Sequence, residues 1–348
     1  MSEKKQKYRG AIVGLGFIGA ADQVSGDALG QRVEGLDGTH LHAMLNHPQV
    51  ELVAGSSRDS GRRERFTERT PARTYADWRE MLASEQLDIV SVATYAPQHA
   101  EMTIACAERG VRAVFCEKPV ATRLADAEEM LAACDRAGCL LVINHIRRFW
   151  PNLRRLSELV VAGEIGDLTS VSVEWGSGRL GNVGTHMFDA IGMLTGRRVE
   201  AVSATLDLSG RPDCRGDQFR DPGGWGVLRL EGGTMATFDA SDHGCIPARI
   251  AINGTKGRAL VSSDMRIDYH DGRSTSFPDE EPAMSSMDRA MGEIVEWLDD
   301  GRAFPCSATD SVSALEVIVA CHASHRRSAA WTALPLEGAD RDIVVQSG

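Results

Sequence analysis

Short, almost continuous apolar runs recur through the first part of the chain and alternate with segments of helical periodicity. The apolar runs predict strands over residues 8–13, 49–55, 87–93, 111–116 and 140–144. The segments between them predict helices over residues 40–46, 75–83, 98–109 and 124–137. Strands that are apolar on both faces are typical of a parallel sheet covered by helices. The pattern therefore predicts an α/β domain over about residues 1–145.

The pattern changes after residue 145, where strands follow one another without intervening helices. Strands are predicted over residues 168–175, 199–207, 226–231, 234–239, 250–252 and 258–262. Helices are predicted over residues 153–162, 186–195, 284–300 and 309–329. Consecutive strands joined by glycine-containing turns indicate an antiparallel or mixed sheet that is open on one face. We therefore expect a second, α+β domain over residues 146–348.

The first predicted strand runs directly into a glycine-rich turn with the spacing Gly-x-Gly-x-x-Gly. Gly14 permits the tight turn, Gly16 lets the backbone approach a pyrophosphate, and Gly19 lets the next helix pack against the strand. The N-terminus of that helix, around Phe17 and Ile18, then presents N–H groups and a positive dipole end to the phosphates. The turn therefore predicts that the first domain is a dinucleotide-binding Rossmann domain.

The segment between Gly19 and the second predicted strand is longer than one crossover helix requires. Its middle, residues 25–38, is rich in glycine and aspartate. We expect an inserted loop over residues 20–38, near the phosphate end of the sheet. It is either a surface excursion without a role or a lid over the site.

The end of the second predicted strand indicates the choice of cofactor. An NAD-specific domain places an acidic residue there, where it binds the ribose 2′-hydroxyl. The residues at this position are Ser56, Ser57 and Arg58, followed by Arg62 and Arg63. Serine and arginine suit a 2′-phosphate through charge-assisted hydrogen bonds, so the sequence favours NADP. Asp59 stands slightly later in the chain and keeps NAD possible.

Composition limits the partners of the protein. The net charge is −11 and no dense run of Lys and Arg offsets it, which argues against nucleic acid or an anionic membrane. No apolar run reaches the about 18 residues of a membrane span. The eight cysteines form no C-x-x-C pair, so we expect reduced thiols and a cytoplasmic protein. The histidines show no metal-ligand grouping, and no metal site is predicted.

Three further motifs carry chemically active side chains. Glu117-Lys118-Pro119 follows the fourth predicted strand, where the ligands of doubly wound sheets bind, and a lysine there can place an ammonium beside a reacting carbon. The second motif follows the fifth predicted strand and contains Asn144, His145, Arg147 and Arg148. The third opens a helix of the second domain and contains Asn182, His186 and Asp189.

In their order and spacing these motifs resemble the Gfo/Idh/MocA oxidoreductase family, which includes glucose–fructose oxidoreductase and inositol dehydrogenases. The resemblance spans nearly the whole chain and includes Thr94, Tyr95 and His99 after the third predicted strand. It implies a mainly antiparallel open sheet in the second domain, whose free face often forms a subunit interface, and so a homodimer or homotetramer. We count Thr94, Tyr95, His99, Glu117 and Lys118 as cofactor-binding residues; the alternative for His99 is a role at its helix N-terminus.

The resemblance also implies a mechanism, because the family's lysine corresponds to Lys118 and its catalytic histidine to His186. A substrate hydroxyl would hydrogen-bond to both residues. His186 would remove its proton as general base while hydride leaves the same carbon for the nicotinamide. Lys118 would stabilise the developing alkoxide. Asn182 stands where the family usually has aspartate, so it can orient the substrate but cannot act as a base.

Other residues of these motifs are candidates for substrate binding. Arg147 and Arg148 either bind a carboxylate or phosphate of the substrate or form salt bridges between the domains. Asp189 would orient the substrate or His186, and His145 is a further candidate. Side chains that either line a sugar pocket or, for the tryptophans, pack in the core are Trp175, Arg179 and Trp225.

The function that the sequence favours is an NAD(P)-dependent dehydrogenase or reductase of a sugar, an inositol or a related polyol. One alternative is a redox-neutral enzyme that keeps its nicotinamide bound while it processes glycosides, for which Asn182 and the insertion leave room. The other is a non-enzymatic sensor that binds a dinucleotide and a partner protein. The presence of both Lys118 and His186 argues against the sensor.

Overall fold

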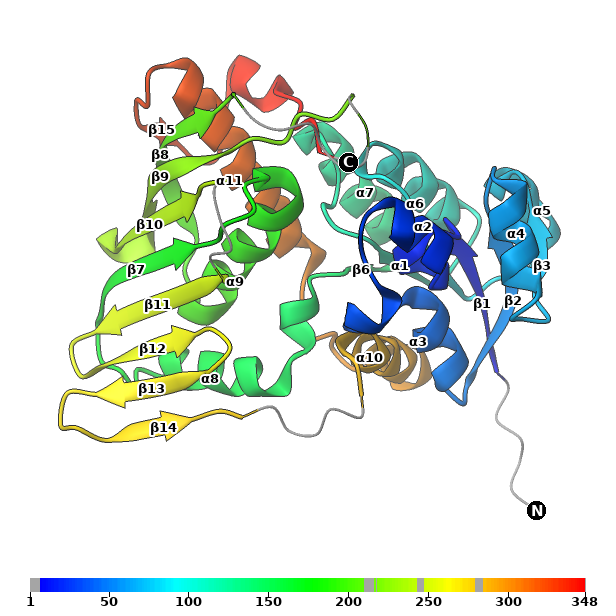
Figure 1. Cartoon of the computed structure of the whole chain (residues 1–348), viewed down its shortest axis with the longest axis horizontal. Helices are drawn as coiled ribbons and strands as arrows, with labels where there is room; N and C mark the ends of the chain where they lie inside the picture. Colours follow the sequence, from blue (N-terminus) through cyan, green and yellow to red (C-terminus); the bar gives the residue numbers. More distant parts are fainter. Residues whose placement is uncertain (1–6, 210–215, 217, 243–246, 279–283, 348) are drawn as a thin grey trace. The chain divides into compact units, whose positions relative to one another are not determined.

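The computed structural model describes residues 7–209, 216, 218–242, 247–278 and 284–347 of the chain, which divides into two compact units (Figure 1). The first unit comprises Met1–Ala121, Asp126–Ile146 and Ala283–Ala308. The second comprises Thr122–Ala125, Arg147–Pro282 and Thr309–Gly348. Each unit contains a sheet and an apolar core of its own.

A six-stranded parallel sheet forms the centre of the first unit. Its strands are β1 (Tyr8–Val13), β2 (Val50–Ser56), β3 (Arg73–Tyr75), β4 (Ile89–Val92), β5 (Ala113–Cys116) and β6 (Leu140–Ile143). They lie in the order β3-β2-β1-β4-β5-β6, so the order reverses between β1 and β4. In parallel sheets of this kind, ligands bind beside that reversal, at the carboxyl ends of the strands.

Helices flank this sheet (Figure 1). They include α1 (Phe17–Ala20), α2 (Gln23–Ala28), α3 (His40–Asn46), α4 (Ser60–Thr67), α5 (Trp78–Ser84), α6 (His99–Glu108) and α7 (Leu124–Ala137). The prediction of a Rossmann-type α/β domain is confirmed. The sequence did not predict β3 and α4, because the stretch is polar and the buried residue of α4 is Phe66 alone. A helix with so little apolar surface gives no periodic signal.

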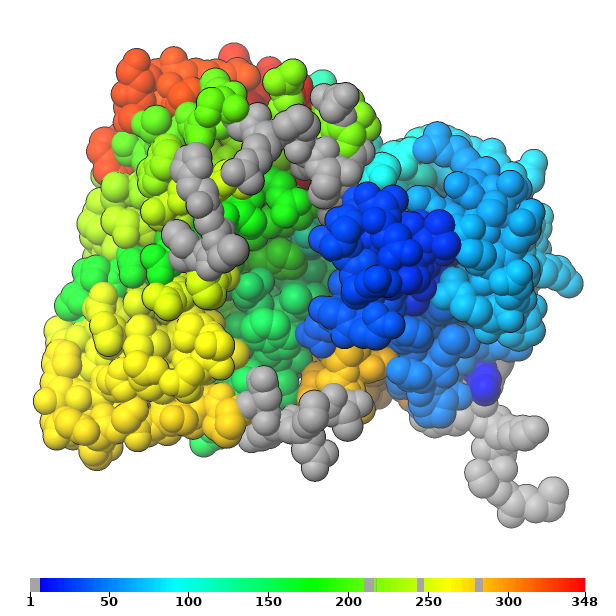
Figure 2. Space-filling model, in the orientation of Figure 1, coloured from blue at the N-terminus to red at the C-terminus, as the bar shows by residue number. Residues whose placement is uncertain are grey.

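The segment after the glycine turn differs most from the predicted arrangement. Helix α1 ends after about one turn, at Ala21, whose backbone is left-handed with φ of 51°. Helix α2 and a 3₁₀ turn (Val33–Gly35) then precede α3. The expected inserted loop over residues 20–38 therefore contains a short helix and a turn, and Figure 2 shows this segment in dark blue at the surface of the first unit.

Helix α10 (Ser286–Asp300) belongs to the first unit, although it follows the strands of the second in sequence. The backbone N–H of Ser286 donates to Asp37 Oδ1 (3.0 Å), and Arg112 donates to the carbonyl of Leu298 (3.0 Å). The hydroxyl of Tyr8 donates to Asp299 Oδ1 (2.7 Å). The sequence placed residues 284–300 in the second domain, because a local pattern does not reveal which core an amphipathic helix covers.

The second unit is built on a nine-stranded sheet in the order β14-β13-β12-β11-β7-β10-β9-β8-β15. Its strands are β7 (Leu168–Glu174), β8 (Val199–Asp207), β9 (Gly223–Leu230), β10 (Met235–Ala240), β11 (Arg249–Gly254), β12 (Gly257–Val261), β13 (Arg266–Tyr269), β14 (Ser274–Ser276) and β15 (Thr332–Ala333). The pair β7–β10 is parallel and the other pairs are antiparallel. The predicted mainly antiparallel fold is confirmed; β13, β14 and β15 are short and were not predicted.

Helices α8 (Pro151–Val161), α9 (Thr185–Thr195) and α11 (Ala308–Arg326) accompany this sheet. Trp175 is 2% exposed and packs against Phe188 and Phe238, with ring centroids 6.0 and 6.2 Å away. Its indole N–H donates to the carbonyl of Gly178 (2.7 Å). Of the two roles expected for Trp175, the structure therefore selects core packing, whereas Trp225 of β9 is 42% exposed.

Two further observations concern the described residues. None of their helices is both long and apolar enough to cross a membrane. Cys106, Cys116, Cys134, Cys139 and Cys321 form no disulfide, and Cys214 and Cys245 lie outside the described residues.

The burial of His322 in α11 predicts a loss of stability in mild acid. Burial lowers the pKa of His322 to about 4, with smaller contributions from Arg326 and His325. In the unfolded chain His322 therefore binds a proton near pH 6.5, whereas in the folded protein it binds one only near pH 4. The stabilisation is complete above pH 6.5 and is lost as the pH falls towards 4, up to about 3 kcal/mol.

Calorimetric Tm values between pH 7.5 and 4.5 check this prediction. His322→Gln should flatten the decrease of Tm below about pH 6.5, whereas the same change at the exposed His270 should leave the profile as in the wild type. Parallel profiles for the wild type and His322→Gln would contradict it.

Candidate functional site

The glycine turn after β1 leaves no room for side chains at two of its three glycines. Gly14 has a φ of +100°, and a Cβ there would overlap the carbonyl oxygen of Ala93. A Cβ at Gly19 would overlap the carbonyl oxygen of Gly14. At Gly16 a Cβ would have only the guanidinium of Arg62 within 4 Å, at 3.6 Å from Nη1. Backbone is thus exposed at Gly16, as a dinucleotide pyrophosphate requires.

The helix that follows this turn is short. Helix α1 contains four residues, so few peptide dipoles add up along its axis. Phe17 is buried, and its ring lies against Gly26 of α2, where a Cβ would overlap it. Ile18 is partly exposed. Two short helices, α1 and α2, therefore follow the glycine turn in place of one continuous helix.

In the loop after β2, the side chain of Arg58 is exposed, whereas the carboxylate of Asp59 is bound to the backbone of α4. Asp59 is the N-cap of α4 and its Oδ1 accepts from the backbone N–H of Arg62 (2.9 Å). Arg63 donates to the carbonyls of Ser57 (2.5 Å) and Arg58 (3.0 Å) and so braces the loop. The side chain of Arg58 is exposed and forms no ion pair with a described residue. Ser56 is buried, and its carbonyl accepts from the N–H of Gly14 (2.9 Å).

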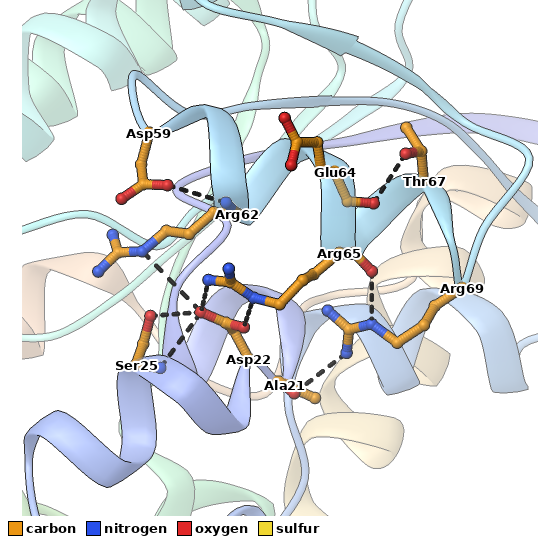
Figure 3. A network of polar contacts seen from close by, with 9 residues as sticks. All are labelled: Ala21, Asp22, Ser25, Asp59, Arg62, Glu64, Arg65, Thr67 and Arg69. Carbon is orange, nitrogen blue, oxygen red and sulfur yellow. Dashed lines mark hydrogen bonds and ion pairs between the residues drawn. The ribbon is translucent and has the colours of Figure 1, made fainter.

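A buried carboxylate that the sequence did not single out joins α2 to α4 (Figure 3). Asp22 is 2% exposed and accepts from the Nε and Nη2 of Arg65, at 2.7 and 2.9 Å. It also accepts from the backbone N–H (3.2 Å) and the hydroxyl (2.5 Å) of Ser25. Arg62 Nε lies 4.0 Å from the same carboxylate. Although burial opposes ionisation, the hydrogen bonds from Arg65 and Ser25 hold the pKa of Asp22 below its usual value.

A second buried carboxylate lies at the end of β5. Glu117 Oε1 accepts from Asn144 Nδ2 (2.7 Å) and lies 3.1 Å from His40 Nε2, whose Nδ1 is 2.9 Å from Ser91 Oγ. Although burial raises it, the contacts with His40, the charge of Lys118 and the Asn144 hydrogen bond lower the pKa of Glu117 to about 2. Glu117 thus anchors the strand end from inside the unit, and the adjacent Lys118 is partly exposed.

The residues after β4 are joined to the Lys118–Pro119 segment through His99. His99 is fully buried, and its Nδ1 and Nε2 lie 2.8 and 3.1 Å from the carbonyl oxygens of Pro119 and Thr94. Burial lowers the pKa of His99, opposed by its hydrogen bonds to the backbone of Thr94 and Pro119. Thr94 is partly exposed and Tyr95 is 43% exposed. His145, by contrast, is buried just after the end of β6.

In the second unit, the predicted catalytic residues lie where a π-helical turn (Leu180–Gly184) runs into α9. The carboxylate of Asp221 accepts from the backbone N–H groups of Gly181 and Asn182, both at 2.7 Å. Asn182 is buried, and His186 in the first turn of α9 is partly exposed. Arg179 begins this turn in the left-handed region, with a φ of 55°. Asp221, which no motif indicated, thus fixes the backbone that carries Asn182.

Arg148 and Asp189 form a buried ion pair inside the second unit. Arg148 Nε lies 2.9 Å from both carboxylate oxygens of Asp189, and its Nη2 lies 2.8 Å from Oδ1. Arg148 Nη1 also contacts Asp310 Oδ2 (3.0 Å). The side chains of Arg148 and Asp189 are 11% and 1% exposed. Arg148 thus has two carboxylate partners within this unit, and its expected role in binding the substrate or joining the domains stays a prediction.

Arg147 differs from its neighbour. Its guanidinium lies over the Trp150 ring, 5.5 Å from the centroid, and forms no hydrogen bond or ion pair with a described side chain. Burial lowers the pKa of Arg147, opposed by the nearby charge of Asp189. Among the described residues, no cluster of three or more His, Cys, Asp or Glu could hold a metal ion.

The fold and the glycine turn of the first unit define an NAD-binding oxidoreductase of the Rossmann type. Residues 8–145 match the model of the oxidoreductase family with an NAD-binding Rossmann fold, and residues 153–260 match the GFO/IDH/MocA C-terminal domain. The chain therefore belongs to the GFO/IDH/MocA oxidoreductase family, whose named members among its homologues are dehydrogenases that act on sugar or diol hydroxyls.

Individual relatives share about a quarter to a third of their residues with the chain. D-apiose dehydrogenase of Paraburkholderia graminis is 28% identical over 78% of this chain and 72% of its own. Myo-inositol 2-dehydrogenase of Thermotoga maritima is 30% identical over 55% of this chain and 61% of its own. The crystal structure of the aldose-aldose oxidoreductase of Caulobacter crescentus, complexed with glycerol, has a TM-score of 0.77 at 22% identity and covers 94% of this chain and 100% of that one. This last likeness shows the shared fold.

The ion pair between Arg148 and Asp189 predicts a large effect of a single substitution. Arg148→Gln leaves the buried Asp189 carboxylate without its cation and should lower the free energy of unfolding by about 3–5 kcal/mol. Asp189→Asn in the same chain removes that carboxylate and should restore part of the loss. Urea titrations of the single and double variants measure both effects. Equal stability of wild type and Arg148→Gln would show that the pair carries no such role.

Proposed function

We propose that the protein is an NAD(P)-dependent dehydrogenase or reductase of a sugar, an inositol or a related polyol. The observation that carries the proposal is the placement of Lys118 directly after β5, at the same edge of the parallel sheet where β1 runs into the glycine turn. In doubly wound sheets this edge binds the dinucleotide. The sugar and inositol dehydrogenases among the relatives support the substrate class.

The proposed reaction assigns separate tasks to the side chains of the two units. The nicotinamide, when bound, supplies the hydride acceptor or donor. Lys118 binds the reacting hydroxyl and stabilises the negative charge that develops on its oxygen. His186 removes the proton of that hydroxyl at a ring nitrogen and returns it when a ketone is reduced. Asn182 orients the substrate without taking part in proton transfer, because an amide is not a base.

The buried residues of the first unit keep Lys118 in place. Glu117 holds the end of β5 through Asn144 and His40, and its charge is next to Lys118 in the chain. The charge of Lys118 in turn helps to lower the pKa of Glu117, and a lysine ammonium at this position can stabilise an alkoxide. We assign Glu117 to this supporting role, and the backbone beside His99 to the nicotinamide end of the cofactor site.

We further propose that NADP is preferred over NAD. The loop after β2 contains an exposed Arg58, and its acidic residue, Asp59, is already the N-cap of α4. A 2′-phosphate is bound well by an arginine guanidinium, whereas a ribose 2′-hydroxyl needs a carboxylate that is free to accept. Arg147 is proposed to bind an anionic group of the substrate, because its own charge has no carboxylate partner among the described side chains.

The proposed activity predicts substrate-dependent reduction of the nicotinamide. The purified protein is offered NADP or NAD with a panel of aldoses, inositols, sugar acids and glycosides, and absorbance of the reduced nicotinamide is followed. We expect reduction with at least one substrate, faster with NADP. Lys118→Ala and His186→Ala should each lower kcat by about 10²-fold or more while cofactor binding persists.

His42→Ala serves as the control, because it replaces an exposed histidine outside the proposed site, and this variant should keep the activity. No reduction with any substrate, combined with a nicotinamide that is recovered bound to the purified protein, would favour a redox-neutral enzyme or a sensor instead.

We also propose that the free face of the sheet in the second unit binds a second copy of this chain. The register of β9 and β10 places Trp225, Arg229 and Met235 on one face, because Trp225 pairs with Asp239 and Arg229 pairs with Met235. Trp225 and Met235 are 42% and 38% exposed. A hollow of about 570 Å³ lies along β7, β10, β11 and β12 of the same sheet. Large exposed apolar side chains of this kind mark contact surfaces.

The mass of the protein in solution checks this assembly. Light scattering should give a dimer or tetramer for the wild type and a smaller particle for Trp225→Glu, because a buried carboxylate would face the partner's sheet. Trp78, which is partly exposed, lies in the first unit, and Trp78→Glu should leave the mass unchanged. A wild-type monomer at the concentrations of the assay would refute the proposed interface.

A further inference from the structure

The guanidinium of Arg62 lies beside the one glycine of the turn whose surface remains open. Arg62 is the third residue of α4, and its side chain is 35% exposed. Its Nη1 and Cζ would lie 3.6 and 3.7 Å from a Cβ at Gly16. The nearest carboxylate is that of Asp22, which approaches Nε rather than the terminal nitrogens and only to 4.0 Å. The terminal N–H groups of Arg62 therefore have no carboxylate partner among the described residues.

The carboxylate of Asp22 is already saturated by other donors. Arg65 donates to both of its oxygens in a two-pronged contact, and Ser25 adds its backbone N–H and its hydroxyl to Oδ2 (Figure 3). Arg65 thus neutralises Asp22. Arg62 approaches the same carboxylate only with Nε, so its two terminal nitrogens do not contact Asp22. A side chain held in this way keeps its charge and its two terminal donor groups available.

This arrangement compensates for the division of the first helix. A long helix would bring an undivided dipole and a row of N–H groups to a phosphate, but α1 ends after four residues. The segment that interrupts it contains Asp22, the N-cap of α2. The insertion therefore removes part of the helix and supplies the carboxylate that directs a cation from α4 towards the exposed backbone at Gly16.

We propose that Arg62 binds a phosphate group of the dinucleotide and that Asp22 is the positioning residue that directs Arg62 to it. The inference rests on the proposed cofactor binding and extends it to a role for the insertion. The phosphate belongs either to the pyrophosphate, which all nicotinamide dinucleotides share, or to the 2′-phosphate, which only NADP carries. Arg65 holds Asp22, and Arg69 holds the backbone beside it by donating to the carbonyl of Ala21 (3.0 Å).

Cofactor affinity measured by the fluorescence of the bound reduced cofactor tests the proposal without any substrate. Wild type, Arg62→Gln, Arg62→Lys, Asp22→Asn and the double variant Asp22→Asn/Arg62→Gln are titrated with NADPH and with NADH. Arg69→Gln is the matched control, because it removes the same charge and also loosens the segment at Ala21. A thermal melt of each variant reports folding separately.

Arg62→Gln should raise the Kd about tenfold or more, as expected for the loss of a charge-assisted hydrogen bond, and Arg62→Lys should restore part of the affinity. Asp22→Asn should weaken binding less. In the Arg62→Gln background it should have no further effect, because Asp22 acts through Arg62. Arg69→Gln should bind as the wild type does. If NADPH and NADH are weakened equally, the phosphate is the pyrophosphate; if NADPH alone is weakened, it is the 2′-phosphate.

Three results would overturn the inference. Unchanged affinity of Arg62→Gln for both cofactors would remove Arg62 from the site. An undiminished effect of Asp22→Asn in the Arg62→Gln background, or an equal loss in Arg69→Gln, would make the network a structural support only. Should Asp22→Asn fail to fold, Arg62→Gln, Arg62→Lys and Arg69→Gln still decide the role of Arg62. A wild type that binds neither cofactor would instead refute the proposed function itself.

Discussion

The close contact of the backbone at Gly14 with the backbone at Gly19 and Ala93 is the constraint on which the site in the first unit depends. Neither Gly14 nor Gly19 leaves space for a Cβ, because neighbouring backbone atoms occupy that space. Only glycine at these positions allows the tight turn from β1 into α1. The N–H of Gly14 is tied to β2 through the carbonyl of Ser56. Gly16 is then the position of the turn where the backbone is accessible, and the side chains that could bind a phosphate there must lie close to Gly16.

Buried carboxylates arrange the cations near this edge of the sheet. Asp22 and Glu117 lie inside the first unit, and each is satisfied by local donors, Arg65 and Ser25 in one case and Asn144 and His40 in the other. A satisfied buried carboxylate costs little and fixes the segment that carries it. Arg62 lies beside the first of these carboxylates, and Lys118 is next to the second in the chain.

The same principle has a different outcome in the second unit. There the buried carboxylate of Asp189 and the carboxylate of Asp310 both contact Arg148, and these contacts tie the 3₁₀ turn that carries Arg148 to α9 and α11. Asp221 fixes the π-helical turn through backbone N–H groups, which leaves the side chain of Asn182 out of that contact.

Periodicity and the glycine spacing predicted the parallel sheet, the turn and the mainly antiparallel second sheet, because each of these features depends on a pattern of neighbouring residues in the chain. The partnership of Asp22 with Arg65 joins residues 43 positions apart, and that of Arg148 with Asp189 joins residues 41 apart. No local pattern specifies such pairs. Helix α4 was not predicted, because it buries little apolar surface. Helix α10 was assigned to the second domain, because an amphipathic pattern does not show which core the helix packs against.

A crystal structure of the protein with NADPH bound would test the arrangement at the glycine turn. We expect the pyrophosphate to lie against the backbone of Gly14 and Gly16, with a phosphate oxygen within hydrogen-bond distance of the Arg62 guanidinium and Asp22 still held by Arg65. A cofactor phosphate that lies away from the glycine turn, or an Arg62 side chain that contacts no phosphate, would contradict it.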